Sequence, residues 1–157
     1  MAGIYIHIPF CKQACNYCDF HFSTSLRSKE IMLAAIAKEL ENRKNYLNGE
    51  TIDTVYIGGG TPSILSKKEL ELLLDVVSDN FNMNSKAEIT LEANPDDLTK
   101  QKLKELSSLA INRLSIGVQS FNNADLMWMN RAHNSTQVDD CLENAQQAGF
   151  SDRKSVV

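Results

Sequence analysis

The chain has 157 residues, of which 43% are hydrophobic and 23% charged, and its net charge is −4. These values predict one domain with a substantial buried core, exclude a disordered or collagen-like chain, and argue against nucleic acid as a partner, because surfaces that follow phosphates are usually basic. No apolar stretch reaches the roughly 18 residues that span a bilayer, and the N-terminus does not resemble a secretory signal, so we expect a cytoplasmic protein without a transmembrane segment.

Strand-like and helix-like segments alternate along the chain. The short β-branched and aromatic stretches that predict buried strands are residues 3–8, 54–57, 88–92 and 113–118. The helical patterns between and after them cover residues 28–47, 66–81, 98–109, 122–129 and 136–148. This βα order predicts a parallel sheet with right-handed crossovers, and ligands of such sheets bind at the carboxyl ends of the strands.

The first strand leads directly into a cluster of cysteines, Cys11, Cys15 and Cys18, spaced C-x3-C-x2-C. In a cytosolic protein such clustering favours metal ligation over disulfides. Cubane iron–sulfur clusters normally take four thiolates, so three would leave one iron open to chelate the amine and carboxylate of a methionine moiety. The alternative is a zinc site with His7 or His21 as the fourth ligand, which is less favoured because the chain lacks a second C-x2-C element.

Two further segments place unusual residues at strand ends. Residues 58–63, Gly-Gly-Gly-Thr-Pro-Ser, follow the second strand, where glycines let a ligand approach the backbone; a bare tight turn is the alternative. The segment lacks the Gly-Lys-Ser/Thr ending of a P-loop. Glu92 ends the third strand, where its carboxylate could accept hydrogen bonds from a ribose or an ammonium group, unless it caps a helix or faces solvent.

The second half of the chain adds polar residues near the same expected edge of the sheet. Gln119 lies at the exit of the fourth strand, whereas Arg113 begins that strand and is interpreted as structural. Arg131 and His133 follow the short helix and could equally be surface basic residues. Cys141 lies on the apolar face of the last helix, which predicts a buried structural thiol.

The cysteine spacing after a first strand resembles the signature of the radical S-adenosylmethionine (SAM) enzymes. The string Tyr-Ile-His-Ile-Pro-Phe-Cys ending at Cys11 resembles the branch of oxygen-independent coproporphyrinogen III dehydrogenases and HemW heme chaperones, and the resemblance extends from residue 4 to about residue 149. It implies a [4Fe–4S] cluster on the three cysteines, with Arg131 meeting a SAM carboxylate and Tyr17, otherwise a core aromatic, stacking on adenine. The SAM contacts it implies are Tyr5, Tyr17, Gly59, Gly60, Thr61, Glu92, Gln119 and Arg131.

Two features favour the HemW side of this branch. The dehydrogenases carry a fourth cysteine, C-x3-C-x2-C-x-C, where this chain has Phe20, and they have an N-terminal extension where this chain enters its first strand at Gly3. The resemblance therefore implies a SAM-binding heme chaperone, with heme or porphyrin and heme-accepting proteins as partners, and with heme as a further cofactor of the full-length protein. A coproporphyrinogen dehydrogenase, a zinc-binding module and an inert fragment are the alternatives.

The resemblance ends after Phe150, where the family continues into a fifth strand. We expect residues 1–150 to be the N-terminal part of a radical SAM core domain and residues 151–157 to be an aberrant tail rather than a fifth strand. The expected fold is α/β, a truncated partial (β/α)6 barrel with about four βα units. An unpaired edge at residues 113–118 would then favour aggregation of the isolated chain.

Overall fold

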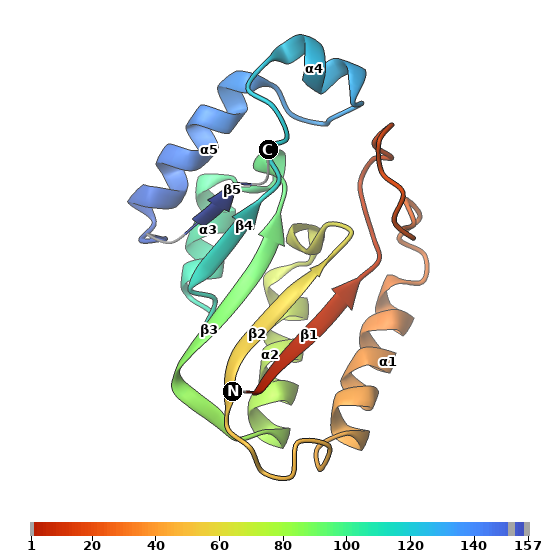
Figure 1. The fold of residues 1–157 in the computed structure, drawn as a ribbon, viewed down its shortest axis with the longest axis vertical. Helices are drawn as coiled ribbons and strands as arrows, with labels where there is room; N and C mark the ends of the chain where they lie inside the picture. Colours follow the sequence, from red (N-terminus) through yellow and green to blue (C-terminus); the bar gives the residue numbers. More distant parts are fainter. Residues whose placement is uncertain (1, 151–152, 156–157) are drawn as a thin grey trace.

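A parallel sheet with strand order β1-β2-β3-β4-β5 forms the centre of the protein (Figure 1). The structure, a computed structural model, describes residues 2–150 and 153–155. The strands are β1 (Ala2–Ile8), β2 (Ile52–Gly59), β3 (Met83–Ala93), β4 (Arg113–Ile116) and β5 (Arg153–Ser155). Each pairs in parallel with the next, so the sheet follows the chain in order and the carboxyl ends of all its strands lie at one edge.

Helices connect the strands. They are α1 (Lys29–Asn42), α2 (Lys67–Asn80), α3 (Lys100–Ser107), α4 (Asn123–Trp128) and α5 (Ser135–Gln147), with short 3-10 helices η1 (Pro62–Ile64) and η2 (Pro95–Asp97). Right-handed crossovers between strands that follow one another in order place their helices on the same face of the sheet. The capping box expected at Ser66 and Glu69 begins α2 as predicted.

The two faces of the sheet differ in polarity because side chains alternate along each strand. In β1, Ile6 and Ile8 are buried in the core, whereas Tyr5 and His7 are exposed on the opposite face. The core beneath the helices is apolar, and the alternate residues of β1 give the other face a polar character at its carboxyl end. That edge is where the sequence predicts ligand binding.

The predicted elements are present, with differences at their ends. Helix α1 ends at Asn42 instead of residue 47, and the chain turns at Asn48 and Gly49, both with positive φ. Strand β3 begins at Met83, upstream of the expected residue 88. Strand β4 ends at Ile116 rather than at residue 118, because the backbone turns sharply there and Gln119 has a φ of 67°.

The tail contradicts one prediction. Arg153–Ser155 forms a short strand parallel to β4, with Leu114 opposite Arg153 and Ile116 opposite Ser155. The expectation that residues 151–157 add no strand is therefore wrong for residues 153–155, and β4 is not the raw edge that was predicted. The hydrophobic pattern did not predict this strand, because three residues are too few to show the alternation by which a strand is recognised in a sequence. The other tail residues lie outside the described part of the chain.

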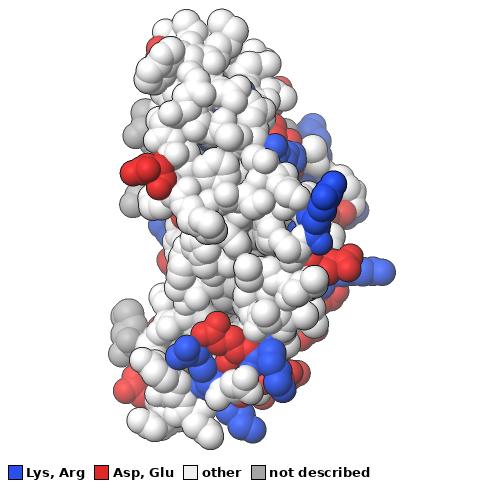
Figure 2. Space-filling view, turned by 90° about the vertical axis from the view of Figure 1, so that its right-hand side faces the viewer, with Lys and Arg blue, Asp and Glu red and all other residues white. Residues whose placement is uncertain are grey.

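Among the described residues, no helix is both long and apolar enough to cross a membrane. Figure 2 shows the side of the molecule that lies on the right in Figure 1, and its upper and middle parts carry few charged side chains. This face has no continuous basic surface of the kind that nucleic-acid phosphates require.

Candidate functional site

A cavity of about 350 Å³ opens at the carboxyl ends of the strands. Every residue that the sequence predicted as a site residue lines it, although these residues are spread over more than a hundred positions of the chain. From the cysteine loop and β1 these are Tyr5, Cys11, Cys15, Tyr17 and Cys18, and from the later segments Gly59, Gly60, Thr61, Glu92, Gln119 and Arg131.

The cysteine loop is anchored to the segment that follows α4. The Asn16 backbone N–H donates to the Met129 carbonyl at 3.0 Å, and the Asn16 side chain donates to the Trp128 carbonyl at 2.6 Å. The Gln13 amide donates to the Asn130 carbonyl at 2.8 Å and to its side-chain oxygen at 2.7 Å. These contacts fix the loop from which the three thiols face the cavity.

The thiols lie close enough to affect one another electrostatically. Burial raises the pKa of the Cys11 thiol, a hydrogen bond from Thr61 lowers it, and the neighbouring Cys18 and Cys15 raise it again. In the described part of the chain, no three His, Cys, Asp or Glu side chains gather as ligands of one metal ion. Three thiols in one loop match the cysteine ligands of iron–sulfur clusters, whereas structural zinc sites usually have four protein ligands.

The glycine loop lies directly against the cysteine loop. The Gly60 N–H donates to the Ile8 carbonyl at 2.8 Å, and the Thr61 N–H donates to the Phe10 carbonyl at 2.7 Å. A Cβ on Gly60 would lie 2.7 Å from the Phe10 oxygen and 3.0 Å from the Cys11 sulfur. Only a residue without a side chain fits here, so the glycine is required by the close approach of the two loops.

Glu92 is held by two donors at the cavity wall. Its carboxylate accepts from the Tyr56 hydroxyl at 2.7 Å and from the Gly59 N–H at 2.9 Å. Glu92 neither caps a helix nor lies free in solvent. Tyr5, which is 58% exposed, stacks on Tyr56 with ring centroids 6.0 Å apart, and its hydroxyl lies 2.9 Å from Nδ1 of His7.

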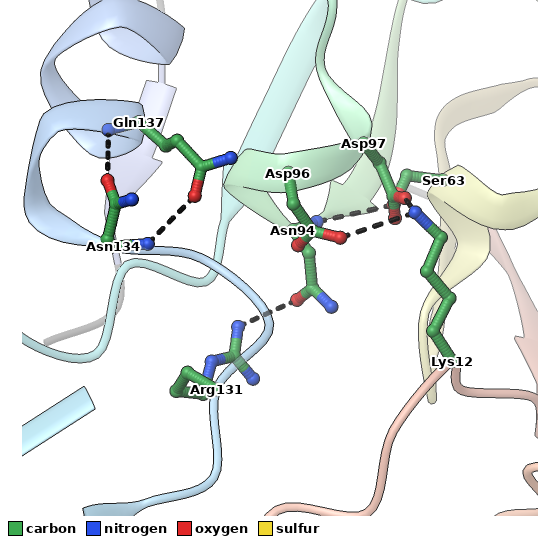
Figure 3. Close-up of polar contacts among 8 residues, drawn as sticks. All are labelled: Lys12, Ser63, Asn94, Asp96, Asp97, Arg131, Asn134 and Gln137. Carbon is green, nitrogen blue, oxygen red and sulfur yellow. Dashed lines mark hydrogen bonds and ion pairs between the residues drawn. The ribbon is translucent and has the colours of Figure 1, made fainter. Parts of the chain in front are cut away.

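Arg131 connects three parts of the site. One terminal nitrogen donates to the Asn94 side chain at 2.8 Å and to the Gly117 carbonyl at 2.9 Å (the Asn94 contact is drawn in Figure 3). The other donates to the Cys15 sulfur and to the Tyr17 hydroxyl, both at 3.3 Å. Arg131 is thus not a solvated surface residue, and Tyr17, 45% exposed at the cavity, is not a core aromatic.

His133 is buried, which rules out the surface alternative. Its Nε2 donates to the Val118 carbonyl at 3.0 Å, and its Nδ1 is buried without a hydrogen-bond partner among the described residues. Burial lowers the pKa of His133, so the ring is neutral near pH 7. Cys141 is buried in the core, as predicted, and Arg113 contacts Thr90 and Glu88 at the far end of the sheet.

Sequence reasoning missed several residues of the cavity wall. They are His7, which the sequence suggested only as a zinc ligand, and Gln13, Phe22, Ala93, Asn94, Ser115 and Gly117. Asn94 and Gly117 lie in segments that the sequence analysis placed at strand ends, and that position could have indicated that they line the cavity. Ser115 faces the cavity because it lies beside Glu92 in the β3–β4 register.

Comparison with known proteins agrees with this geometry. The radical SAM superfamily matches residues 5–157. Heme chaperone HemW of Lactococcus lactis is 42% identical over 146 residues, 93% of this chain and 38% of that protein, and heme chaperone HemW of Bacillus subtilis is 38% identical over 96% of this chain and 40% of that protein. The solved structure of coproporphyrinogen III oxidase (HemN) from Escherichia coli, a radical SAM enzyme, matches with a TM-score of 0.90 at 30% identity, over 98% of this chain and 36% of that chain.

The chain thus spans about two fifths of the length of the HemW relatives. The fold predicted from the sequence, an α/β parallel sheet of the radical SAM type, is confirmed by the sheet order and by the match to HemN. With the superfamily matching almost the whole sequence and the three cysteines at the mouth of the sheet, the chain belongs to the radical SAM superfamily.

Proposed function

We propose that this chain is the cluster- and SAM-binding part of a HemW-like heme chaperone. The observation that carries the proposal is the convergence of Cys11, Cys15 and Cys18 with all the predicted SAM contacts on one cavity at the carboxyl ends of the strands. The names of the two HemW relatives support the heme chaperone branch. When bound, a [4Fe–4S] cluster with SAM supplies one-electron chemistry, which the protein directs by positioning.

The residues around the cavity would have different roles in binding the cluster and SAM. The three cysteines would hold three irons. The glycine loop would let SAM approach the backbone, and Glu92 would accept a hydrogen bond from the SAM ammonium or ribose. Arg131 has a planar fork suited to a carboxylate, and it lies 3.3 Å from the Cys15 sulfur, so it would bind the carboxylate of SAM close to the cysteine loop.

Anaerobic reconstitution with iron and sulfide tests the site. We expect the wild-type chain to bind iron and sulfide with the absorption of a [4Fe–4S] cluster, and Cys15→Ala to lose it. Cys141→Ala is the matched control, because that thiol is buried in the core and away from the cavity. An unchanged iron content in Cys15→Ala would contradict the ligand assignment. Zinc without sulfide in the purified protein would favour the zinc alternative.

The second candidate is coproporphyrinogen III dehydrogenase activity, favoured by the likeness to HemN. Phe20 argues against it, because this residue replaces the dehydrogenases' fourth loop cysteine and lies 80% exposed at the cavity. We expect a full-length protein with this N-terminal part to bind heme without decarboxylating coproporphyrinogen III when reductant and SAM are supplied. Robust turnover would overturn the HemW assignment and leave the cluster site standing.

A further inference from the structure

Lys12, which follows the first cluster cysteine, reaches across the site to the exit of β3. Its ammonium pairs with Asp97 and lies 3.2 Å from the Asp96 carboxylate (Figure 3). Asp97 lies in η2, and its side chain is only 3% exposed. The root of the cysteine loop is therefore tied to a buried acid that is far away in the sequence.

The contacts continue from Asp97 and return to the cysteine loop. The Ser63 hydroxyl donates to Asp97 at 2.6 Å and accepts from the Asn94 N–H at 3.2 Å. The Asn94 side chain accepts from Arg131, and Arg131 donates to the Cys15 sulfur. We call this closed circuit the polar ring; it consists of Lys12, Asp97, Ser63, Asn94, Arg131 and Cys15.

The polar ring joins the loops that would carry the cluster and SAM. Lys12 and Cys15 belong to the cysteine loop, Ser63 follows the glycine loop in η1, and Asn94 follows Glu92 at the end of β3. A bond between two exposed charges would restrain these loops little. The side chain of Lys12 is 48% exposed, but the carboxylate of Asp97 is buried, so removing this cation from it is unfavourable.

We propose that Lys12 and Asp97 are positioning residues that fix the cysteine loop against the SAM-binding loops, an inference that rests on the function proposed above. Neither side chain is needed to bind iron or SAM. Their effect passes through the polar ring, which sets the distance between the thiols and the glycine loop before any cofactor binds.

Hydrogen–deuterium exchange of the whole apoprotein tests the restraint without a cluster. We expect Lys12→Ala to speed exchange of residues 11–18 about fivefold, since losing roughly one ion pair shifts local opening by about that factor. Lys12→Arg should restore slow exchange, because arginine also reaches the two carboxylates. Lys29→Ala is the matched control: it removes another partly buried ion pair, with Glu69, between α1 and α2.

The reconstituted protein gives a second readout. We expect Lys12→Ala and Asp97→Asn to take up the cluster. Both variants should release iron to a chelator about fivefold faster than the wild type and show a broadened electron paramagnetic resonance signal with SAM. Lys12→Arg should show neither of these two changes. Unchanged exchange in residues 11–18 of Lys12→Ala, or equal effects of Lys29→Ala, would overturn the inference. Failure of the wild type to take up a cluster would instead refute the proposed function, and the apoprotein exchange would still decide the role of Lys12.

Discussion

Replacing Glu92 with glutamine separates the charge of this residue from its hydrogen bonds. The carboxylate accepts from the Tyr56 hydroxyl and the Gly59 N–H, at 2.7 and 2.9 Å. The Gly59 amide can only donate, but the Tyr56 hydroxyl can also accept. A glutamine side chain can therefore place its oxygen on Gly59 and its NH2 group on the Tyr56 oxygen, so the geometry survives while the charge is lost.

The size of each effect follows from these two bonds. Hydrogen bonds to a charged group contribute about 1.5–3 kcal/mol and neutral ones about 0.5–1.5 kcal/mol, so each bond should lose about 1–1.5 kcal/mol when the charge is removed. Glu92→Gln should therefore lower the free energy of unfolding by about 2–3 kcal/mol and Tm by about 6–9 °C. Glu92→Ala removes both bonds and should cost about 3–6 kcal/mol. If Glu92 binds SAM through its charge, Glu92→Gln should weaken SAM binding about 10- to 100-fold.

Three measurements check this reasoning. Anaerobic calorimetry of the reconstituted protein gives the SAM affinity, and thermal denaturation gives Tm. Burial raises the pKa of Tyr56, and the hydrogen bond to Glu92 raises it further, so Glu92→Gln should move this pKa back toward its usual range. A titration followed by tyrosinate absorbance measures this pKa, and Tyr56→Phe identifies which part of the signal comes from Tyr56. SAM affinity within twofold of wild type would show that Glu92 does not bind SAM. A glutamine variant as unstable as Glu92→Ala would refute the exchange of hydrogen bonds.

Two further predictions concern stability. Gly59→Ala should lower the free energy of unfolding, measured by urea denaturation, by about 2–3 kcal/mol, because φ is 114° and a Cβ would lie 2.7 Å from the His7 ring. Gly49→Ala is the control: φ is 80° but the space around it is open, so it should cost only about 1 kcal/mol. Equal costs would contradict the steric argument. Burial lowers the pKa of His133 below its ordinary value of about 6.5, and Arg131 lowers it further, whereas the Val118 carbonyl and Asp96 raise it. Below that pH the unfolded chain therefore binds a proton on this histidine more readily than the folded chain does. The free energy of unfolding should therefore fall as pH drops below about 6.5, and His133→Gln should flatten that decline; an identical pH profile in the variant would refute the role of burial.

The parts of the fold that depend on local pattern could be read from the sequence. Runs such as 54–57 and 88–92 are rich in β-branched and apolar residues at their centres, and both lie inside strands of the sheet. The capping box of Ser66 and Glu69 marks the start of α2. The cysteine spacing and the triple glycine stand at strand ends, so parallel strands alone bring them to one edge.

Other features depend on contacts between distant residues and carry no periodic signal. Nothing local distinguishes Lys12 from a solvated lysine, because its role depends on Asp97, which only the folded sheet brings near. His133 looks like a surface residue in a polar stretch, yet it is buried beneath the exit of β4. The short strand β5 was missed for the related reason that backbone pairing with β4 forms it.

The backbone turn at Gln119 is a strained part of the cavity wall. Gln119 has a φ of 67°, a left-handed conformation that costs a residue with a side chain about 1 kcal/mol or more. On either side of it, Val118 N–H donates to the Ile116 carbonyl at 3.0 Å and Ser120 N–H donates to the Val118 carbonyl at 2.9 Å, and His133 donates to that same Val118 oxygen. These bonds hold the turn in a conformation that the local sequence does not favour. Val118 is buried in the core and Gln119, which follows it, lines the cavity, so the left-handed turn lies where the chain passes from the core to the wall of the site.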